Sequence, residues 1–144
     1  MSHPQPMFVH KTSVRLHDTD AAGVLYFANQ FRIAHEAYEA FMEQAGFGLG
    51  DVLKRGKIAL PIVRADGDFR MPLHVGDPLE LTLRLLRMGR TSFTLVCRLA
   101  KDGKTAGHVT TTHVAIDPRT RRKKELPAAL RRALAPLKNT PLTA

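Results

Sequence analysis

Two carboxylates and a glycine stand directly before a helical segment, and this spacing suits acyl transfer. Asp18 and Asp20 precede the small-residue turn 21–23, and an amphipathic segment follows at once. The first N–H groups of a helix have no partner within it and lie at the positive end of its dipole, so they can hold an oxyanion. A carboxylate that is ionised at neutral pH could attack a carbonyl or activate water beside them.

Asp20 is the preferred catalytic residue, with Gly23 allowing the backbone to turn sharply behind it. The N–H groups of Tyr26, Phe27 or Ala28, in the first helical turn, would then point toward the oxyanion. The same pattern has a simpler interpretation, in which an aspartate only caps the turn, as Asp often does. Alternation along the preceding strand does not decide which aspartate is functional.

His35 is a further candidate, because it lies at the edge of the helix's apolar stripe, where a structural role competes with a functional one. His108 and His113 are five residues apart on a strand-like segment and fall on opposite faces, which argues against a shared metal site. No Cys/His/acid cluster has zinc spacing. We therefore predict no metal and no cofactor.

A glycine-centred connection, residues 88–92, carries a cation and two hydroxyls in Arg90, Thr91 and Ser92. These groups suit phosphate binding, and the same residues suit an ordinary hairpin turn. The pattern alone leaves both interpretations open.

The surrounding elements predict an α+β domain with one long helix against an antiparallel sheet. Strand-like alternation covers residues 8–16, with Val14 and Leu16 on one face, and a helix is expected from about residue 28 to 45. Asn29 could cap this helix, and Gly46 could end it. Its apolar stripe, at spacings of three and four, is Phe27, Phe31, Ala34, Tyr38, Phe41 and Ala45.

The remaining chain is mostly strand-like. We expect a short helical turn over 49–55 and strands over 58–70, 79–85, 93–99 and 105–116, with a hairpin at Asp102-Gly103. Pro127 should open a final helix over 128–137. With no linker or repeat, residues 1–144 are predicted to form one domain, with its core over about 8–127.

Composition narrows the partners. The formal charge is +9, from 22 Lys and Arg against 13 Asp and Glu, and residues 119–124 form a dense basic block, so an anionic ligand or a solvated surface is expected. The block has no interleaved aromatic residues for base stacking, which disfavours nucleic acid. No apolar run could span a membrane, no secretory signal is evident, and Cys97 is the single cysteine, so a cytoplasmic protein is expected.

Residues 18–29, DTDAAGVLYFAN, resemble the signature of the 4-hydroxybenzoyl-CoA thioesterase family of hot-dog-fold enzymes. The shared pattern is D-x-D-x-x-G, then apolar and aromatic residues, then Asn near the helix start. Residues 58–81, with Pro61-Ile62-Val63 and Gly76-Asp77-Pro78, resemble the family's second strand and the turn after it. The resemblance covers about residues 8–127.

This resemblance implies a hot-dog fold, in which an antiparallel sheet wraps around one long central helix. It implies homodimers or homotetramers with active sites between subunits, and it assigns Asp20 as the catalytic carboxylate. It places the N–H of Phe27 against the thioester carbonyl. Arg90, Thr91 and Ser92 match the region that contacts the CoA phosphates, usually from a neighbouring subunit.

The helix looks closest to the 1,4-dihydroxy-2-naphthoyl-CoA hydrolases, although many relatives carry an acid where this chain has His35. We therefore expect an acyl-CoA thioesterase, with an aromatic acyl group favoured and with Asn29 and His35 among the substrate-binding residues. Asp20 would act as nucleophile or as general base. The alternative is a non-catalytic hot-dog protein that binds acyl-CoA or acyl carrier protein. A hot-dog dehydratase would need a His and an acid facing across the cleft, and the sequence has no such signature.

Overall fold

The computed structural model describes residues 7–142, and its sheet and helices have the predicted α+β order. Predictions for residues 1–6 and 143–144 lie outside the described residues. The strands are β1 (Val9–Ser13), β2 (Ile62–Phe69), β3 (Pro78–Met88), β4 (Ser92–Lys101) and β5 (Lys104–Val114). The helices are α1 (Phe27–Gln44), α2 (Leu49–Arg55) and α3 (Ala128–Leu134), with short 3-10 helices at Leu16–Asp18 and Ala135–Asn139.

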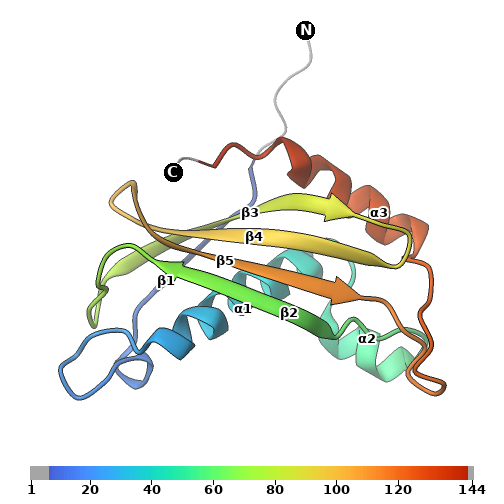
Figure 1. Cartoon of the computed structure of the whole chain (residues 1–144), viewed down its shortest axis with the longest axis horizontal. Helices are drawn as coiled ribbons and strands as arrows, with labels where there is room; N and C mark the ends of the chain where they lie inside the picture. The colour runs from blue at the N-terminus through green and yellow to red at the C-terminus, as the bar shows by residue number, and fades with distance from the viewer. Residues whose placement is uncertain (1–6, 143–144) are drawn as a thin grey trace, which may run out of the picture.

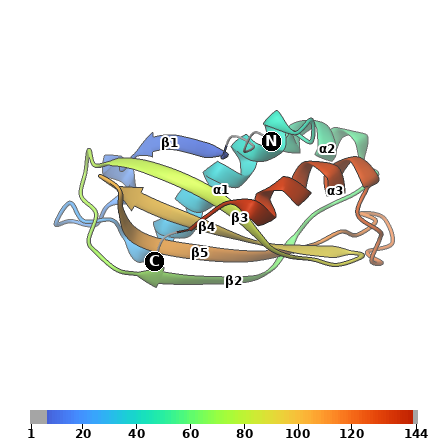
Figure 2. The same cartoon turned by 90° about the horizontal axis from the view of Figure 1, so that it is seen from above.

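The strands form one antiparallel sheet in the order β1-β3-β4-β5-β2. Figures 1 and 2 show α1 lying across one face of this sheet. The β4–β5 connection is the predicted hairpin, and both turn residues, Asp102 at φ 51° and Gly103 at φ 77°, are left-handed. A two-residue turn of this kind matches the twist of the strands it joins.

The core lies between α1 and the inward face of the sheet. Leucines alternate along β3, which contains the strand predicted over residues 79–85, and their inward side chains at 79, 81, 83 and 85 are all buried. The buried face of α1 consists of Gln30, Ile33, Ala34, Ala37, Tyr38, Phe41 and Met42. The predicted stripe was therefore wrong at its start: Phe27 is 58% exposed, because it begins the helix ahead of the first residue packed on the sheet.

Two local predictions near the site were also wrong. Val14 is buried but Leu16 is exposed, because the chain leaves β1 after Ser13 and turns into a 3-10 helix. Asn29 does not cap α1. Tyr26 holds that position, and the Asn29 side-chain amide instead donates to the Asp18 carbonyl at 3.0 Å.

The predicted end of α1 at Gly46 is confirmed. Gly46 has φ 85°, and the Phe47 N–H reaches back to the Met42 carbonyl at 2.8 Å, as in a Schellman motif. The final helix is shorter than expected: α3 ends at Leu134 and continues as a 3-10 helix, with Pro127 at the N-cap position.

The two edges of the sheet differ. β1 pairs only with the first part of β3, from Ser13 opposite Pro78 to Val9 opposite Thr82, and α3 lies along the other part (Figure 1). At the opposite edge, all eight residues of β2 are exposed and β5 is the neighbouring strand. The outer side of β2 therefore has backbone groups without a strand partner. Within residues 7–142, no helix is long and apolar enough to cross a membrane.

Candidate active site

The segment between β1 and α1 folds back on itself, so that Asp18 lies beside Tyr26 at the start of the helix and Asp20 lies opposite Val24. Thr19 and Leu25 form an isolated antiparallel bridge, and the Asp20 N–H donates to the Val24 carbonyl at 2.8 Å. Gly23, at φ 77°, makes the reversal, and its carbonyl accepts the Val75 N–H at 3.1 Å. The reversal brings the carboxylate-bearing loop beside the first turn of α1.

One carboxylate oxygen of Asp20 accepts hydrogen bonds from the backbone of its own loop, and the other oxygen remains available. Its Oδ1 accepts hydrogen bonds from the N–H groups of Ala22 at 2.8 Å and Val24 at 3.2 Å. Among residues 7–142, its Oδ2 has no hydrogen-bond or ion-pair partner. Asp20 is exposed, so that oxygen is open to a ligand or to water. Turn capping and a chemical role are thus compatible.

The first turn of α1 carries two N–H groups with no backbone acceptor among the described residues, those of Phe27 and Ala28. The Tyr26 N–H is already used, because it donates to the Asp18 carbonyl at 3.0 Å. The Asn29 N–H bonds back to the Tyr26 carbonyl at 2.9 Å. Of the three N–H groups considered from sequence, those of Phe27 and Ala28 therefore remain available for an oxyanion, at the positive end of an 18-residue helix.

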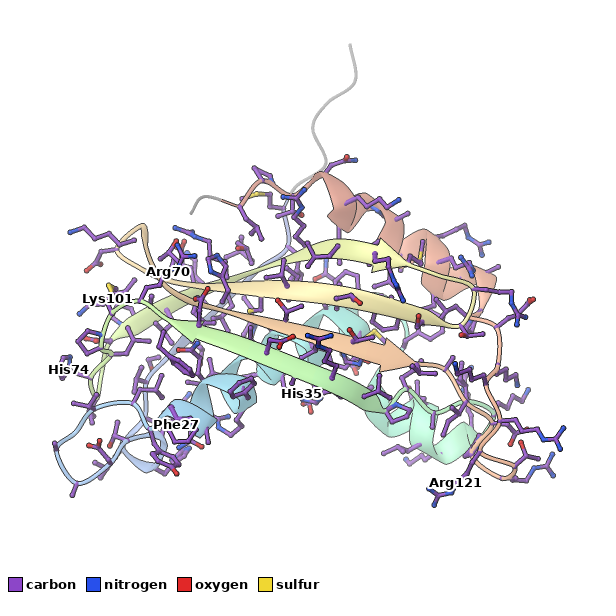
Figure 3. All side chains as sticks on the ribbon, in the orientation of Figure 1. Phe27, His35, Arg70, His74, Lys101 and Arg121 are labelled. Atoms are coloured by element: carbon purple, nitrogen blue, oxygen red, sulfur yellow. The ribbon has the colours of Figure 1, made fainter. Side chains whose placement is uncertain are left out.

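A hollow of about 340 Å³ adjoins Phe27, between the start of α1 and the end of β2. The Phe27 ring contacts Tyr26 at 4.8 Å and Phe69 at 6.3 Å between ring centroids. Figure 3 shows Phe27 at the same end of the molecule as Arg70, a cation of the hollow's wall. The hollow is lined by Leu25, Phe27, Gln30, Phe69, Arg70, Met71, Pro72 and Leu73.

Gln30 is a residue of this hollow that sequence reasoning missed. It is 2% exposed, and its Nε2 donates to the Asp68 carbonyl at 2.8 Å, which ties α1 to β2. The only sequence signal was a polar side chain at a helical position that the 3.6-residue period places on the buried face.

The candidate phosphate-binding residues lie far from Asp20 within one chain. The start of β3 adjoins the Asp20 loop, since the Asp77 carbonyl accepts the Val14 N–H and Val75 contacts Gly23. The connection 89–91 follows the other end of β3, about 33 Å away at roughly 3.3 Å per residue. One chain therefore does not bring these two groups together.

Arg90 pairs with a nearby acid, and Thr91 and Ser92 make local hydrogen bonds through their backbone carbonyls. Arg90 is exposed, and its Nη1 lies 3.0 Å from Glu125 Oε1. The Thr91 carbonyl accepts the Ala115 N–H at 2.7 Å, and the Ser92 carbonyl accepts the Gly89 N–H at 2.8 Å. The basic block lies at the same end, as Arg121 shows in Figure 3.

His35 lies midway between these ends, at a second cavity of about 390 Å³ (Figure 3). Its Nδ1 is 3.1 Å from Glu39 Oε1, and its ring contacts Tyr38. The other walls are mainly apolar side chains from α2 and the segments next to β2 and β5, with Arg121 at the margin. The cavity could hold an apolar group, which would contact the rings of His35 and Tyr38 in its wall.

His113 lies on β5, and from sequence it was considered only as a metal ligand together with His108. It is fully buried, with its ring stacked on Phe93 at 4.8 Å and beside Tyr38 at 4.4 Å, while His108 pairs with Asp68 on β2. Burial lowers the pKa of His113 to about 4, although the Leu60 carbonyl opposes the shift. At neutral pH this buried imidazole, next to Tyr38, is therefore uncharged.

No group of three or more His, Cys, Asp or Glu side chains within residues 7–142 is arranged to hold a metal ion. The acidic side chains at the site are Asp18, which is buried and paired with Arg32, and Asp20, which is exposed.

Comparison with known proteins gives a consistent result. A family model described as "Thioesterase-like superfamily" matches residues 14–134. A 1,4-dihydroxy-2-naphthoyl-CoA hydrolase from Rippkaea orientalis is 38% identical over 131 residues, covering 89% of this chain and 95% of that protein. One from Nostoc punctiforme is 40% identical over 120 residues, covering 83% and 81%.

A solved structure of similar fold is a 1,4-dihydroxy-2-naphthoyl-CoA thioesterase from Synechocystis. It has a TM-score of 0.86 at 31% identity, over 94% of this chain and 100% of that one. A gentisyl-coenzyme A thioesterase has a TM-score of 0.78 at 26% identity, over 88% and 98%.

Proposed function

The chain belongs to the thioesterase-like superfamily, and on that premise we propose that it hydrolyses the thioester bond of an aromatic acyl-CoA. The observation that carries the proposal is the open Oδ2 of Asp20 in the loop that leads into a helix start whose Phe27 N–H has no backbone acceptor among the described residues. A charge that develops on a carbonyl oxygen is stabilised where fixed donors already point.

The thioester carbonyl oxygen accepts the Phe27 N–H, and Asp20 acts on the carbonyl carbon by one of two routes. As nucleophile, its carboxylate forms an anhydride and expels the CoA thiolate, and water then cleaves the anhydride. As general base, it takes a proton from a water that attacks directly. Either route consumes one water and yields the free acid and CoA. A thiolate leaves readily, so the mechanism requires no strong general acid, and we propose no metal and no cofactor.

A second copy of the chain completes the site in this proposal. β2 is an exposed edge, and two such strands can pair antiparallel about a two-fold axis. Pairing centred on the strand sets Ile62 of one copy against Phe69 of the other. The hollow beside Phe27 then meets the cavity beside His35 of the second copy. The apolar walls of β2 in this contact would include Val63, which is 60% exposed.

The same pairing supplies the remaining site residues from the second copy. Arg90 and Thr91 directly precede β4, and Ser92 begins it opposite Val114 at the end of β5. This end of the sheet is near the start of β2, since the Val114 N–H donates to the Pro61 carbonyl at 3.1 Å. From there these three residues reach the phosphates of a CoA whose thioester lies at Phe27 of the first copy. A homodimer is the smallest assembly that meets this need, and a homotetramer would repeat it.

The acyl group is proposed to be aromatic for two reasons. The similar proteins are named for 1,4-dihydroxy-2-naphthoyl-CoA and gentisyl-CoA, both hydroxylated aromatic thioesters. The cavity beside His35 is mainly apolar, with Tyr38 and the His35 imidazole as its ring side chains. A ring would bury its faces there, while His35 could meet a hydroxyl. We also propose a cytoplasmic location, where CoA thioesters are available as substrates. Among residues 7–142, no helix is long and apolar enough to cross a membrane.

The test is thiol release from a panel of aromatic, short-chain and long-chain CoA thioesters by the wild type and Asp20→Asn. We expect aromatic thioesters to turn over fastest and Asp20→Asn to lower kcat by about a hundredfold or more. The matched control is Asp102→Asn, an exposed aspartate in a left-handed turn that Asn also tolerates. Full activity in a folded Asp20→Asn protein would refute the catalytic assignment.

A non-catalytic acyl-CoA or acyl-carrier-protein binding protein is the second candidate. It is favoured by one observation, the engagement of Asp20 Oδ1 in the turn, which is what a purely structural aspartate does. Tight CoA binding without turnover of any thioester by the wild type would establish this alternative.

A further inference from the structure

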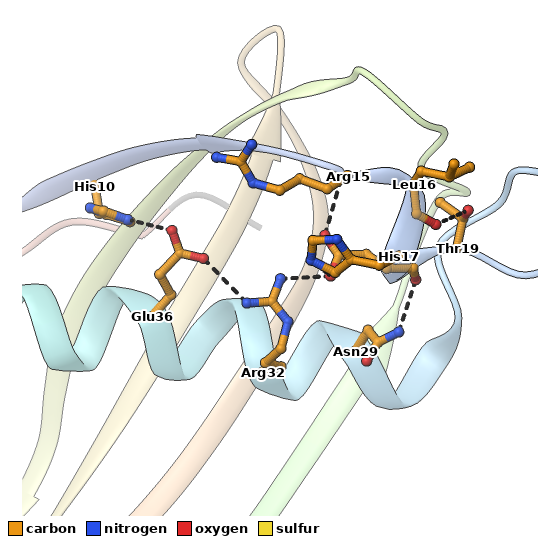
Figure 4. Close-up of polar contacts among 9 residues, drawn as sticks. His10, Arg15, Leu16, His17, Thr19, Asn29, Arg32 and Glu36 are labelled. Atoms are coloured by element: carbon orange, nitrogen blue, oxygen red, sulfur yellow. Dashed lines mark hydrogen bonds and ion pairs between the residues drawn. The ribbon is translucent and has the colours of Figure 1, made fainter.

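Asp18 is buried under the start of α1, although Asp20, two residues later, is exposed. Both of its carboxylate oxygens have partners. Its Oδ1 lies 2.7 Å from Arg32 Nη2, and its Oδ2 accepts the Arg15 N–H at 3.0 Å (Figure 4). A buried carboxylate is stable only when it is paired in this way, and such charge-assisted bonds are among the stronger ones.

The backbone carbonyl of Asp18 is equally committed. It accepts the N–H of Tyr26 at 3.0 Å and the side-chain amide of Asn29 at 3.0 Å. Tyr26 directly precedes Phe27, so the peptide unit that carries the Phe27 N–H begins at a residue held by Asp18. The carboxylate and the carbonyl of one residue thus hold the start of α1 through Tyr26, Asn29 and Arg32.

The ion pair continues away from the site. Arg32 Nη1 lies 3.5 Å from Glu36 Oε2, and Glu36 Oε1 lies 3.1 Å from His10 Nε2 on β1 (Figure 4). Arg32 therefore has a fixed acidic neighbour on each side, and its guanidinium joins the Asp18 loop to the body of the helix. The Arg32 side chain is half exposed to solvent, whereas the Asp18 carboxylate at the other side of the pair is buried.

We propose that Asp18, acting through Arg32, is a positioning residue that holds the Phe27 N–H in register with the Asp20 carboxylate. The inference rests on the proposed thioester hydrolysis. Neither oxygen of Asp18 is open to substrate, which separates its role from that of Asp20. An oxyanion donor works through its preorganised placement, and misplacement by about 1 Å can lower a rate a hundredfold. The network therefore affects kcat more than KM.

The test uses Asp18→Asn, Arg32→Gln and the double variant, with kcat, KM and the pH dependence of kcat measured on an aromatic CoA thioester. We expect each single variant to lower kcat about tenfold while KM stays within about twofold. Residues that act as one unit are not additive, so the double variant should lose no more than the worse single one. Arg32→Lys keeps the charge and should recover part of the lost kcat.

A purely structural role would lower the melting temperature of Asp18→Asn but leave kcat per folded molecule unchanged, and that result would overturn the proposal. The acidic limb of the kcat–pH profile decides between the two aspartates. It should persist in Asp18→Asn, because the Asp20 carboxylate proposed as the catalytic group is unchanged in this variant; its disappearance would make Asp18 the base and overturn the positioning role. Glu36→Gln, one contact further along, should have the smaller effect on kcat.

Failure of the underlying function has a different signature. If the wild type hydrolyses no thioester, there is no reaction to position and both proposals fall together. If the wild type and Arg32→Gln are equally active and Asp20→Asn is inactive, the hydrolysis stands and the positioning role alone is refuted.

Discussion

The side-chain amide of Gln30, buried on α1, donates a 2.8 Å hydrogen bond to the carbonyl of Asp68 near the end of β2. This bond joins the helix that carries the proposed oxyanion donors to the edge strand proposed as the subunit contact. Gly107 on β5 makes it possible, because a Cβ there would overlap the Asp68 carbonyl oxygen and lie 2.7 Å from Gln30 Nε2. The helix start and β2 therefore depend on one glycine.

Gly107→Ala should destabilise the protein by about 1–3 kcal/mol, because an added methyl must displace backbone or break the Gln30 bond. Urea unfolding gives the free-energy change. Gly50→Ala is the matched control: it lies inside α2 with nothing within 4 Å of an added Cβ. That variant should gain about 0.5–1 kcal/mol. Equal effects from the two substitutions would contradict the packing argument.

His113 should make stability fall in mild acid. Its folded-state pKa of about 4 lies below the unfolded value of about 6.5, so the unfolded chain binds a proton that the folded protein excludes. The free energy of unfolding should therefore decrease as pH falls from about 6.5 toward 4, by up to about 3 kcal/mol from this group. Urea midpoints at pH 7 and pH 4.5 measure the effect.

The comparison for this prediction is His113→Phe, whose ring could still stack on Phe93. The variant should lose less stability than the wild type across the same pH window. His74→Gln removes a half-exposed histidine and should leave the wild-type slope. An unchanged slope in His113→Phe would show that another group controls the acid response.

An active site shared between two copies predicts complementation between defective chains. In a mixed dimer of Asp20→Asn with Arg90→Ala, one site receives Asp20 from one chain and Arg90 from the other. Random mixing makes half the dimers mixed, so about a quarter of wild-type sites should be intact. The assay is thiol release from a CoA thioester far below KM, after the two variants are unfolded and refolded together.

Two controls define this experiment. In the first control, Asp20→Asn is mixed with Asp102→Asn. Both variants keep Arg90 and only the Asp102→Asn chains keep Asp20, so the number of active sites should equal the number of Asp102→Asn chains, with no gain on mixing. Pantetheine thioesters, which lack the nucleotide phosphates, should not respond to Arg90→Ala. No gain over the separate variants would place the whole site within one chain.

Several features followed from local sequence alone. Alternating leucines predicted β3, because a strand that packs one face must bury every second side chain. Asp102-Gly103 predicted its hairpin, and Gly46 the end of α1, because left-handed positions favour these residues. The D-x-D-x-x-G signature predicted a hot-dog thioesterase, and the chain belongs to the thioesterase-like superfamily. The single-domain organisation and the assembly stay predictions.

The errors share one cause, which is that partners distant in sequence override local preference. Asn29 suits a helix cap, but the Asp18 carbonyl takes its amide, and Tyr26 holds the cap position. Phe27 fits the apolar stripe by spacing, but at the first position of α1 it stays 58% exposed, in contact with Phe69 at the end of β2. Leu16 continues the β1 alternation only if the strand continues, and the chain turns after Ser13.

The sequence by itself determined which functional groups are present and in what order: two aspartates, a turn glycine and a helix start, within a recognisable family pattern. Only the tertiary structure decided how the roles of Asp18 and Asp20 differ. It buries Asp18 against Arg32 and leaves an oxygen of Asp20 open, and it places Arg90 at the far end of β3. Burial, charge pairing and separation depend on which distant segments pack together, and spacing along a chain does not contain that information.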